Sequence, residues 1–284
     1  MSGARAIGLL LGAAADGVVG QPRQVERMVR EKPRALVAGT AVVTGLCLER
    51  AGRNRPIVQA VSTAVATWAV LGGARLASEG TTLARELEQG ELDSARSTLA
   101  VLDTRRTDTL DLIGLSRASV ESVARHTAQT VVGPLFWGAV TGVPGLLGAR
   151  AISALRARSR PCARIRDLTA LPSTWATAAL TVAGAPVVGG SASGAWRTWR
   201  RDTIAHPNPN AGRVEAAFAG ALEIRLGGRT VYPYGVEERP VLGDGRNPDA
   251  GHVTRAVELS RVIGWLTALG SALLAAVLGL RRSR

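Results

Sequence analysis

The sequence predicts an all-α membrane protein with about five hydrophobic helices and further helices in the connecting loops. Hydrophobic residues make up 46% of the 284 residues, yet only 4% are aromatic, so alanine, valine and leucine supply most of the apolar mass. That balance is typical of membrane proteins rather than of an ordinary soluble core. The apolar residues also gather in long runs, and about 20 in a row cross the hydrocarbon layer of a bilayer. We therefore expect a multi-pass protein of the cell membrane.

Five apolar runs are candidates for membrane segments. They are residues 35–48, 57–77, 130–149, 173–196 and 262–280. The last is the clearest, with the sequence VIGWLTALGSALLAAVLGL. The third and fourth runs contain the pairs Gly138/Gly142 and Gly190/Gly194, whose spacing suits close helix packing in lipid. The distribution of arginine among the loops leaves the orientation in the membrane open.

The remaining segments are expected to be helical as well. The apolar run from Ile7 to Ala15 is followed by Asp16 and by no A-x-A-type cleavage site, which favours an uncleaved, partly inserted helix over a signal peptide. Leucines recur at helical spacing within residues 78–129, so this loop reads as helices. No internal repeat or low-complexity linker divides the chain, and we expect a single domain over residues 1–284.

Several common kinds of site are excluded by what the sequence lacks. It has no G-x-x-x-x-G-K-[ST] motif, no G-x-G-x-x-G after a strand and no G-x-S-x-G, which argues against a Walker or Rossmann ATPase and against a serine hydrolase. His126, His206 and His252 are far apart and lack zinc-ligand spacing. Cys47 and Cys162 form neither a metal-ligand pattern nor a disulfide framework, so both are interpreted as structural.

The positive charge of the chain is almost entirely arginine. The net charge is +13, and Lys32 is the only lysine. The arginine fork binds phosphate and carboxylate groups with two hydrogen bonds at once, so arginine is the main tool left for binding anions. The arginines are scattered between apolar runs without interleaved aromatic residues, and nucleic acid is therefore not expected as a partner.

Residues 206–245 form the most distinctive stretch of the sequence. They contain HPNPNAG, then AAFAGALEIRLGG, then a tyrosine and RPVLGDG. So much glycine, asparagine and arginine does not build a core; it shapes a backbone surface that meets a polar ligand. The structural alternative for these glycines is a tight helix-cap and turn assembly, with Pro209 and Asn210 opening a helix through 211–222.

These motifs resemble a known family. With AIGLLLGAAADGVVGQP near the start, ASVESVA at 118–124 and PLFWGAVTGVPGLLGARA at 134–151, residues 206–245 are similar to the cobalamin biosynthesis family called CobD or CbiB. The resemblance covers nearly the whole chain, with matching order and spacing. It implies a polytopic membrane enzyme, adenosylcobinamide-phosphate synthase.

The resemblance also implies a reaction and its participants. Members of the family join the free propionate of adenosylcobyric acid to aminopropanol phosphate, or a related amino alcohol, with ATP and Mg²⁺. The implied partners are therefore the corrinoid substrate, the amino-alcohol phosphate, membrane lipid and other membrane proteins of the corrinoid pathway. Such chemistry needs an activated carboxylate, neutralised phosphate charge and an amine held beside the acyl carbon.

The family motifs carry over to named positions of this sequence. The implied catalytic residues are Glu121, Ser122, His206 and Asn210. The implied substrate-binding residues are Arg105, Thr107, Gly212, Glu215, Gly227, Gly228, Tyr232, Arg239 and Gly243. Arg239 is expected to hold a carboxylate or phosphate, and paired glycines permit close backbone approach. No metal ligand is assigned.

Other parts of the sequence depart from the family pattern, mostly by loss of acids. The family's G-R-D-T is here Thr104-Arg105-Arg106-Thr107, and after Glu121 and Ser122 the chain has Arg125, His126, Thr127, Ala128 and Gln129. Further departures lie at Gly20-Gln21-Pro22, Glu26-Arg27, Ser153 to Arg158 and Arg166-Asp167. Arginine in place of an acid reverses the charge where a magnesium–phosphate site needs carboxylates. The few acids left are Asp16, Asp108, Asp111, Glu121 and Asp167.

Three functions remain open from the sequence. The first is the family's amide-forming synthase. The second is a catalytically impaired paralogue that binds corrinoid or nucleotide as a membrane partner of the pathway, which the loss of acids favours. The third is a small transporter or scaffold unrelated to cobalamin, which only the composition favours.

Overall fold

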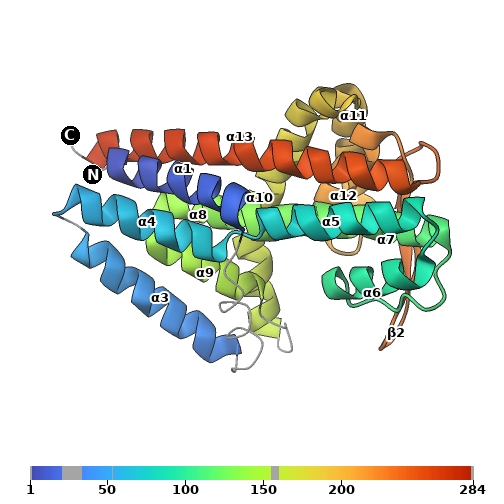
Figure 1. Cartoon of the computed structure of the whole chain (residues 1–284), viewed down its shortest axis with the longest axis horizontal. Helices are drawn as coiled ribbons and strands as arrows, with labels where there is room; N and C mark the ends of the chain where they lie inside the picture. The colour runs from blue at the N-terminus through green and yellow to red at the C-terminus, as the bar shows by residue number, and fades with distance from the viewer. Residues whose placement is uncertain (1, 21–33, 53, 155–159, 283–284) are drawn as a thin grey trace. The chain divides into compact units, whose positions relative to one another are not determined.

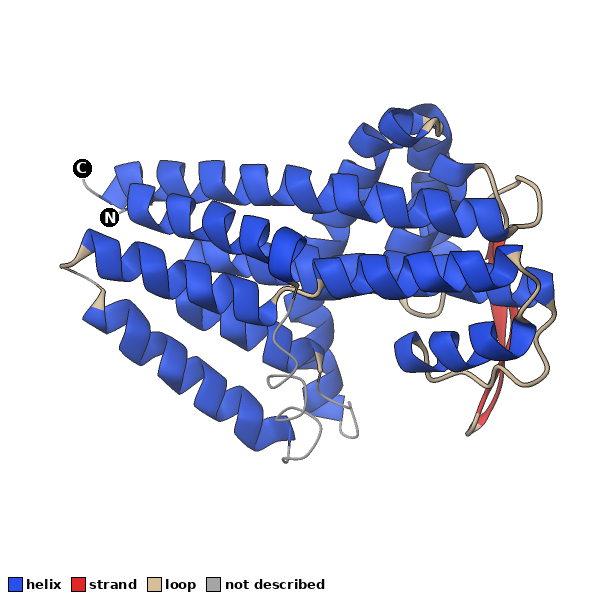
Figure 2. Ribbon diagram, in the orientation of Figure 1, coloured by secondary structure: helices blue, strands red, loops and turns tan. Residues whose placement is uncertain are grey.

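The computed structural model describes residues 2–20, 34–52, 54–154 and 160–282. Helices dominate, as expected, and one antiparallel strand pair accompanies them (Figures 1 and 2). The departures from the family pattern at Gln21-Pro22, Glu26-Arg27 and 155–158, and the lone Lys32, lie outside the described residues. The chain divides into two compact units, one from residues 1–75, 128–173 and 264–284, the other from 76–127 and 174–263. The single domain stays a prediction, and each unit is described by itself.

The first unit is built from paired apolar helices. It contains α1 (Ser2–Val19), α3 (Arg34–Ala51), α4 (Pro56–Val70), the π-helical η1 (Thr127–Val132), α8 (Gly133–Thr141), α9 (Val143–Ser153), the first half of α10 (Arg160–Gly184) and the end of α13 (Ala250–Arg282). Its core joins Leu9 of α1 with Leu135 of α8, Leu146 of α9 and Ala268 of α13. Alanine supplies much of this core because small side chains let helix backbones approach closely.

Helices α1 and α4 pack closely in this unit, and they lie side by side in Figure 1. A Cβ atom on Gly8 would lie 2.6 Å from the carbonyl oxygen of Ala60, and one on Gly12 would lie 2.5 Å from that of Ala64. Gly8 and Gly12 are one helical turn apart, so both face α4, in a G-x-x-x-G pattern. Glycine at these two positions therefore sets the distance between the helices.

The second unit surrounds a buried helix, α12 (Pro209–Leu222), in which every residue from Gly212 to Leu222 is buried. The unit also contains most of α5 (Gly73–Glu88), α6 (Leu92–Leu102), α7 (Leu112–His126), α11 (Ala192–Asp202) and the 3₁₀ turns η2 (Ala185–Val188) and η3 (Thr203–Ala205). The expectation that loop 78–129 is helical is confirmed. So is the helix through 211–222, although its N-cap is Asn208, whose side chain accepts from the amides of Asn210 and Ala211.

The strand pair is a feature that the helical prediction for the loops did not include. Strands β1 (Leu226–Tyr232) and β2 (Gly235–Leu242) pair antiparallel, with Val231 opposite Val236. They appear in red in Figure 2. The hairpin follows α12 directly, and β-branched or aromatic residues at 230–232 suit an extended backbone better than a helix.

About five hydrophobic helices were expected as membrane segments, and the number of candidate spans among the described residues is lower. Three helical stretches of the described residues are long and apolar enough to cross a membrane: Pro56–Glu88, Arg160–Val188 and Ala250–Leu280. The expected segment 35–48 is helical, as α3, but Arg34, Glu49 and Arg50 bring three charges into its 18 residues. The expected segment 130–149 is broken at Gly142, whose φ of 78° separates α8 from α9.

The fourth expected segment is shifted along the chain. The helix runs from Arg160 to Gly184 instead of covering 173–196, because Pro186 sits in a 3₁₀ turn that ends it. Gly190 and Gly194 therefore lie outside the candidate span. They lie against the backbone of α12, where a Cβ on Gly194 would be 2.6 Å from the carbonyl oxygen of Gly220.

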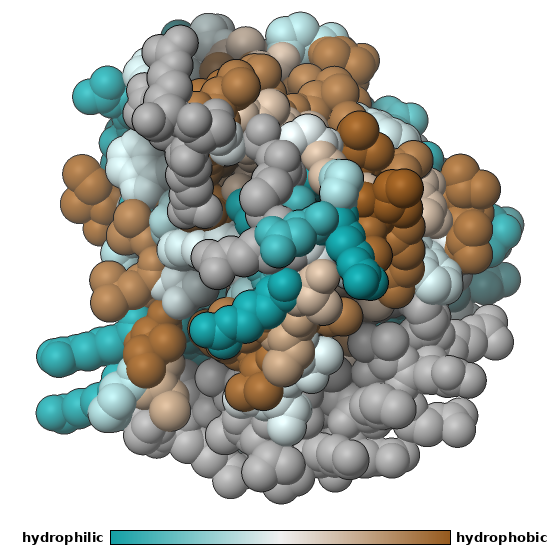
Figure 3. All heavy atoms as spheres, turned by 90° about the vertical axis from the view of Figure 1, so that its left-hand side faces the viewer, coloured by the Kyte–Doolittle hydropathy of each residue, from teal (hydrophilic) through white to brown (hydrophobic). Residues whose placement is uncertain are grey.

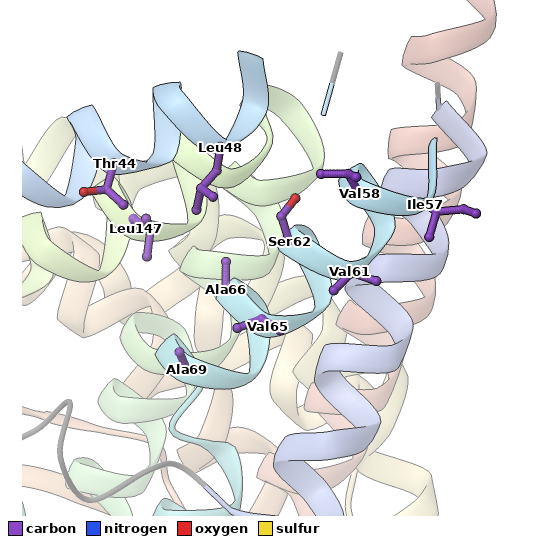
Figure 4. A pocket seen from close by; sticks show the side chains of 10 residues that line it. All are labelled: Thr44, Leu48, Ile57, Val58, Val61, Ser62, Val65, Ala66, Ala69 and Leu147. Atoms are coloured by element: carbon purple, nitrogen blue, oxygen red, sulfur yellow. The ribbon is translucent and has the colours of Figure 1, made fainter. Parts of the chain in front are cut away.

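Large apolar side chains are exposed on the first unit. Examples are Val43 of α3, Val61 of α4 and Leu273 of α13, which are 56% to 67% exposed. Figure 3 shows hydrophobic side chains gathered in groups on the face that it presents. A cavity of about 540 Å³ opens among α3, α4 and α9, lined by apolar side chains such as Leu48, Val65 and Leu147 (Figure 4). These surfaces suit contact with lipid rather than water.

The α1–α4 contact gives a prediction about stability. We expect Gly12→Val to lower the melting temperature of the detergent-solubilised protein by several degrees, because overpacking a helix contact costs about 1–3 kcal/mol. The matched control is Gly3→Val on the same helix, where a Cβ meets nothing within 4 Å. Both variants add the same β-branched residue, so equal shifts in melting temperature would contradict the assigned contact.

Candidate functional site

The second unit contains a buried cluster of charged and polar side chains. It is contributed by the segment after α6, by α7, by the start of α12 and the residues before it, and by both strands. Its members are Asp103, Arg105, Glu121, Ser122, Arg125, His206, Glu215, Tyr232 and Arg239, and they are referred to as the ion cluster. The side chain of Arg125 is 17% exposed and that of Arg239 is 9% exposed. The other members are buried.

Helix α7 supplies the central residues of the ion cluster because their spacing places them on one face of the helix. Asp111 caps its first turn by accepting a hydrogen bond from the amide of Gly114 at 2.7 Å. Glu121 and Arg125 are four residues apart, so their side chains project from the same face, with Ser122 one position further round. Glu121 and Ser122 are buried, as are the other residues from Gly114 to Ala124 except Arg117, and Arg125 is partly buried.

Asp103 is the acceptor at one end of the ion cluster. Its Oδ2 accepts from Arg105 Nε at 2.8 Å, from Arg125 Nη2 at 2.5 Å and from Ser122 Oγ at 2.8 Å. Its Oδ1 accepts from the Arg105 amide at 3.1 Å. Burial alone raises the pKa of Asp103, but Arg125 and Arg105 outweigh it and hold the pKa well below its usual range. Asp103 is therefore ionised.

Glu121 connects α7 with the strand pair. Its Oε2 accepts from Arg105 Nη2 at 2.8 Å, and its Oε1 accepts from the Gly227 amide at 2.8 Å. Gly227 has a φ of 84°, and a side chain there would also collide with the carbonyl of Pro240, so the position requires glycine. Burial raises the pKa of Glu121, but Arg105 and Arg125 reverse the effect and lower it.

Glu215 and His206 face each other at the start of α12. Glu215 Oε1 accepts from Arg125 Nη1 at 3.2 Å, and Glu215 Oε2 lies 3.5 Å from His206 Nε2. Burial raises the pKa of Glu215 to about 7 in spite of Arg125, and burial lowers the pKa of His206. These shifts favour an uncharged imidazole at neutral pH and a carboxyl group that is present in both its protonated and its ionised form. The pair is therefore suited to acid–base catalysis.

Arg239 reaches the same place from β2. Its Nη2 donates to the Tyr232 hydroxyl at 2.7 Å, and its guanidinium lies over the Tyr232 ring, 5.6 Å from the centroid. Its Nη1 is 3.9 Å from both Glu121 Oε2 and Glu215 Oε1, beyond hydrogen-bond distance. The side chain is held in place but keeps one donor group free.

Three buried polar atoms of the ion cluster have no hydrogen-bond partner among the described residues: His206 Nε2, Glu215 Oε2 and Arg239 Nη1. His206 Nε2 lies 3.5 Å from Glu215 Oε2, and Arg239 Nη1 lies 3.9 Å from the other oxygen of the same carboxyl group, Oε1. An unpaired buried polar group costs about 1–3 kcal/mol, so three that converge in one place indicate a site built for a polar ligand.

The ion cluster fits an anion better than a protein-held Mg²⁺. Three arginines face three carboxylates, and Glu215 Oε2 is the one carboxylate oxygen of the cluster without a hydrogen bond. Within the described parts of the chain no group of three or more His, Cys, Asp or Glu side chains is placed to hold a metal ion. A divalent cation would have to displace arginine from its partners.

Eight of the residues expected from the sequence meet in or against the ion cluster. They are Arg105, Glu121, Ser122, His206, Glu215, Gly227, Tyr232 and Arg239. Gly212 supports it from α12, where a side chain would collide with His206.

The other expected residues lie elsewhere. Thr107 interacts with the backbone of Arg96, at 3.4 Å. Asn210 accepts from Arg213 at 3.1 Å, and the Gly243 amide donates to Asp202 at 2.8 Å. Gly228 follows Gly227 in β1, with a φ of 84° and its carbonyl 3.4 Å from the Thr230 hydroxyl. These contacts are with residues outside the ion cluster.

Two central residues were missed by sequence reasoning. Asp103 was not counted among the remaining acids, although it directly precedes the Thr104-Arg105 motif. Arg125 was read only as a departure from the family, although its spacing from Glu121 places both on one helix face. Arg106, which replaces an acid of the family pattern, is exposed and pairs with Asp108 at 2.5 Å, outside the ion cluster.

Comparison with known proteins gives a consistent family. The sequence pattern of the family described as CobD/Cbib protein matches residues 33–260. The protein named cobalamin biosynthesis protein CobD of Mycobacterium tuberculosis H37Rv is 42% identical over 310 aligned positions, covering 98% of this chain and 97% of the relative. The protein of the same name from Chromobacterium violaceum is 32% identical, covering 79% of this chain and 74% of the relative.

No solved structure matches the chain. The family pattern covers most of the chain, including every residue of the ion cluster, and the mycobacterial relative is similar from end to end. The chain belongs to the CobD/CbiB family of cobalamin biosynthesis proteins.

Proposed function

We propose that this chain is an amide-forming synthase of cobalamin biosynthesis, which joins the free propionate of adenosylcobyric acid to aminopropanol phosphate or a related amino alcohol. Family membership supports the pathway. The observation that carries the reaction is the convergence of His206 Nε2, Glu215 Oε2 and Arg239 Nη1 at one buried place. Together these atoms offer a proton acceptor and a cationic donor to a reacting group.

The proposed reaction has two steps. A carboxylate oxygen of the propionate attacks the terminal phosphorus of ATP, and ADP leaves, which gives an acyl phosphate. The amine nitrogen then attacks the acyl carbon, the C–O bond to phosphate breaks, and inorganic phosphate leaves with the electron pair. The nitrogen gives up a proton as the amide forms. The second step therefore needs an anion-binding group and a base close together.

Arg239 and the Glu215–His206 pair fill these two roles. The free Nη1 of Arg239 donates to the carboxylate and then to the acyl phosphate, while Tyr232 accepts from its Nη2 and Glu237 from its Nε. Glu215, with a pKa of about 7, accepts the proton from the amine, and uncharged His206 lies 3.5 Å away to share it. Glu121 and Asp103 keep Arg105 and Arg125 in position.

ATP is the proposed phosphoryl donor. Mg²⁺ usually keeps several waters and binds through one or two carboxylates together with substrate phosphates. The arginine-paired carboxylates of the ion cluster do not form a cation site. The corrinoid, membrane lipid and other membrane proteins of the corrinoid pathway remain the proposed partners, and the multi-pass cell-membrane location is proposed from the three apolar helices.

A second candidate is a catalytically impaired paralogue that binds corrinoid or nucleotide. The specific observation in its favour is the extent of arginine pairing, since Asp103, Glu121 and Glu215 all have an arginine partner. Such an arrangement suits binding as well as catalysis.

An assay of the purified full chain in detergent separates the two candidates. Adenosylcobyric acid, aminopropanol phosphate, ATP and Mg²⁺ are supplied together, and the amide product and ADP are measured by mass spectrometry. The synthase predicts both products in equal amounts. Corrinoid binding without amide or ADP would overturn the synthase and leave the paralogue.

The free donor of Arg239 gives the first variant. We expect Arg239→Lys to reduce kcat by about 10²-fold, because lysine keeps the charge but loses the fixed second donor, and one such donor contributes about 10²–10³-fold. The matched control is Arg229→Lys on the neighbouring strand, whose side chain is 71% exposed. Equal activity of the two variants, with unchanged circular dichroism, would refute the role of Arg239.

The raised pKa of Glu215 gives a pH dependence. The protonated carboxyl cannot accept a proton, so kcat should rise with pH through about 7 and level off above it. Glu215→Gln should lose this limb of the profile and about 10²-fold in kcat. Glu88→Gln, on an exposed position, serves as the control. A limb that persists in Glu215→Gln would assign the titration to another group.

A further inference from the structure

Arg213 is a buried arginine outside the ion cluster. It is 8% exposed, and its Nε has no hydrogen-bond partner among the described residues. Its Nη1 donates to Thr174 Oγ1 at 2.9 Å and to Asn210 Oδ1 at 3.1 Å. None of these partners is a carboxylate, and no ion pair of Arg213 occurs in the part of the chain that the structure describes.

The surroundings of Arg213 differ from those of the arginines in the ion cluster. Burial by itself lowers the pKa of Arg105, but the negative charges of Glu121 and Asp103 outweigh it and raise the pKa. The pKa of Arg125 is raised in the same way by Asp103 and Glu215. For Arg213 burial lowers the pKa and no negative group compensates. An arginine stays charged in proteins, so Arg213 carries a buried positive charge for which the described residues provide no counterion.

The position of Arg213 is fixed by its neighbours. Its guanidinium lies over the ring of Trp175, 4.6 Å from the centroid, and Trp175 packs edge-on against Trp199 at 5.4 Å. Thr174 and Trp175 come from α10, and Asn210 lies one turn before Arg213 on α12. Arg213 and Glu215 are two residues apart on that helix, which places them on nearly opposite faces. The Arg213 site is thus separate from the ion cluster.

We propose that Arg213, held by Thr174, Asn210 and Trp175, binds a phosphate group as a second anion site of this chain. The planar fork of arginine offers two donors to adjacent oxygens of a phosphate, and a dianion supplies the negative charge that the buried guanidinium lacks. Both an amino-alcohol phosphate and a nucleotide carry such a group. Binding at Arg213 does not require that the chain be catalytic.

Titration calorimetry on the full chain in nanodiscs of neutral lipid tests the site. The probes are inorganic phosphate, aminopropanol phosphate, ATP without metal, and acetate as a monoanion. We expect Arg213→Gln to weaken binding of the phosphate probes by at least about tenfold, since a hydrogen bond to a charged group contributes about 1.5–3 kcal/mol. The tighter of aminopropanol phosphate and ATP identifies the source of the phosphate. Arg200→Gln is the control, because Arg200 lies over Trp196 but is exposed.

Two further measurements make the test independent of how well one variant folds. Phosphate should raise the melting temperature of the wild type and of Arg200→Gln but not that of Arg213→Gln. Thr174→Val, which removes only the hydroxyl that Arg213 contacts, should also weaken phosphate binding. Unchanged affinity in Arg213→Gln, equal affinity for acetate, or no binding of any soluble phosphate by the wild type would overturn the site. An effect of Arg213→Gln seen only with anionic lipid in the nanodisc would overturn it too.

Discussion

The neutralisation of buried charge is the constraint on which the second unit depends. Asp103, Glu121 and Glu215 are buried, and each meets an arginine. Breaking one buried pair leaves an uncompensated charge and costs about 3–5 kcal/mol. Because Arg105 and Arg125 each contact two carboxylates, the segment after α6, helix α7 and helix α12 hold one another in register.

The strand pair is part of the same arrangement. Glu121 needs a second donor, and the Gly227 amide of β1 supplies it. Arg239 of β2 then reaches Glu121 and Glu215 at 3.9 Å, where its charge balances the third carboxylate while its Nη1 stays free. The hairpin after α12 thus completes the polar contacts of Glu121, and these contacts help to hold two strands that alone are only marginally stable in water.

The departures from the family pattern take on a different meaning in the folded chain. Arg106 replaces an acid but is exposed and pairs with Asp108, so it brings no charge into the ion cluster. Arg125 lies within the ion cluster, where Asp103 and Glu215 balance it. Arg106 and Arg125 therefore do not reverse the sign of the charge in the ion cluster. They leave a balanced cluster with one free donor and one acid–base pair, which favours chemistry on an anionic substrate over a metal held by the protein.

The sequence by itself determined the helical class, the family and most residues of the ion cluster, because apolar runs, helical leucine spacing and the motif at 206–245 are local patterns. It did not determine the number of spans, since the charges of Arg34, Glu49 and Arg50 and the break at Gly142 matter more than the length of an apolar run. Nor did it reveal that Asp103 and Arg125 complete the ion cluster, or that Asn210 accepts a hydrogen bond from Arg213 instead of joining that cluster. The contact of Arg125 with Asp103 joins residues 22 positions apart, and that of Gly227 with Glu121 joins residues 106 positions apart. Only the tertiary structure decides which buried charges meet, because each must find its partner across the fold.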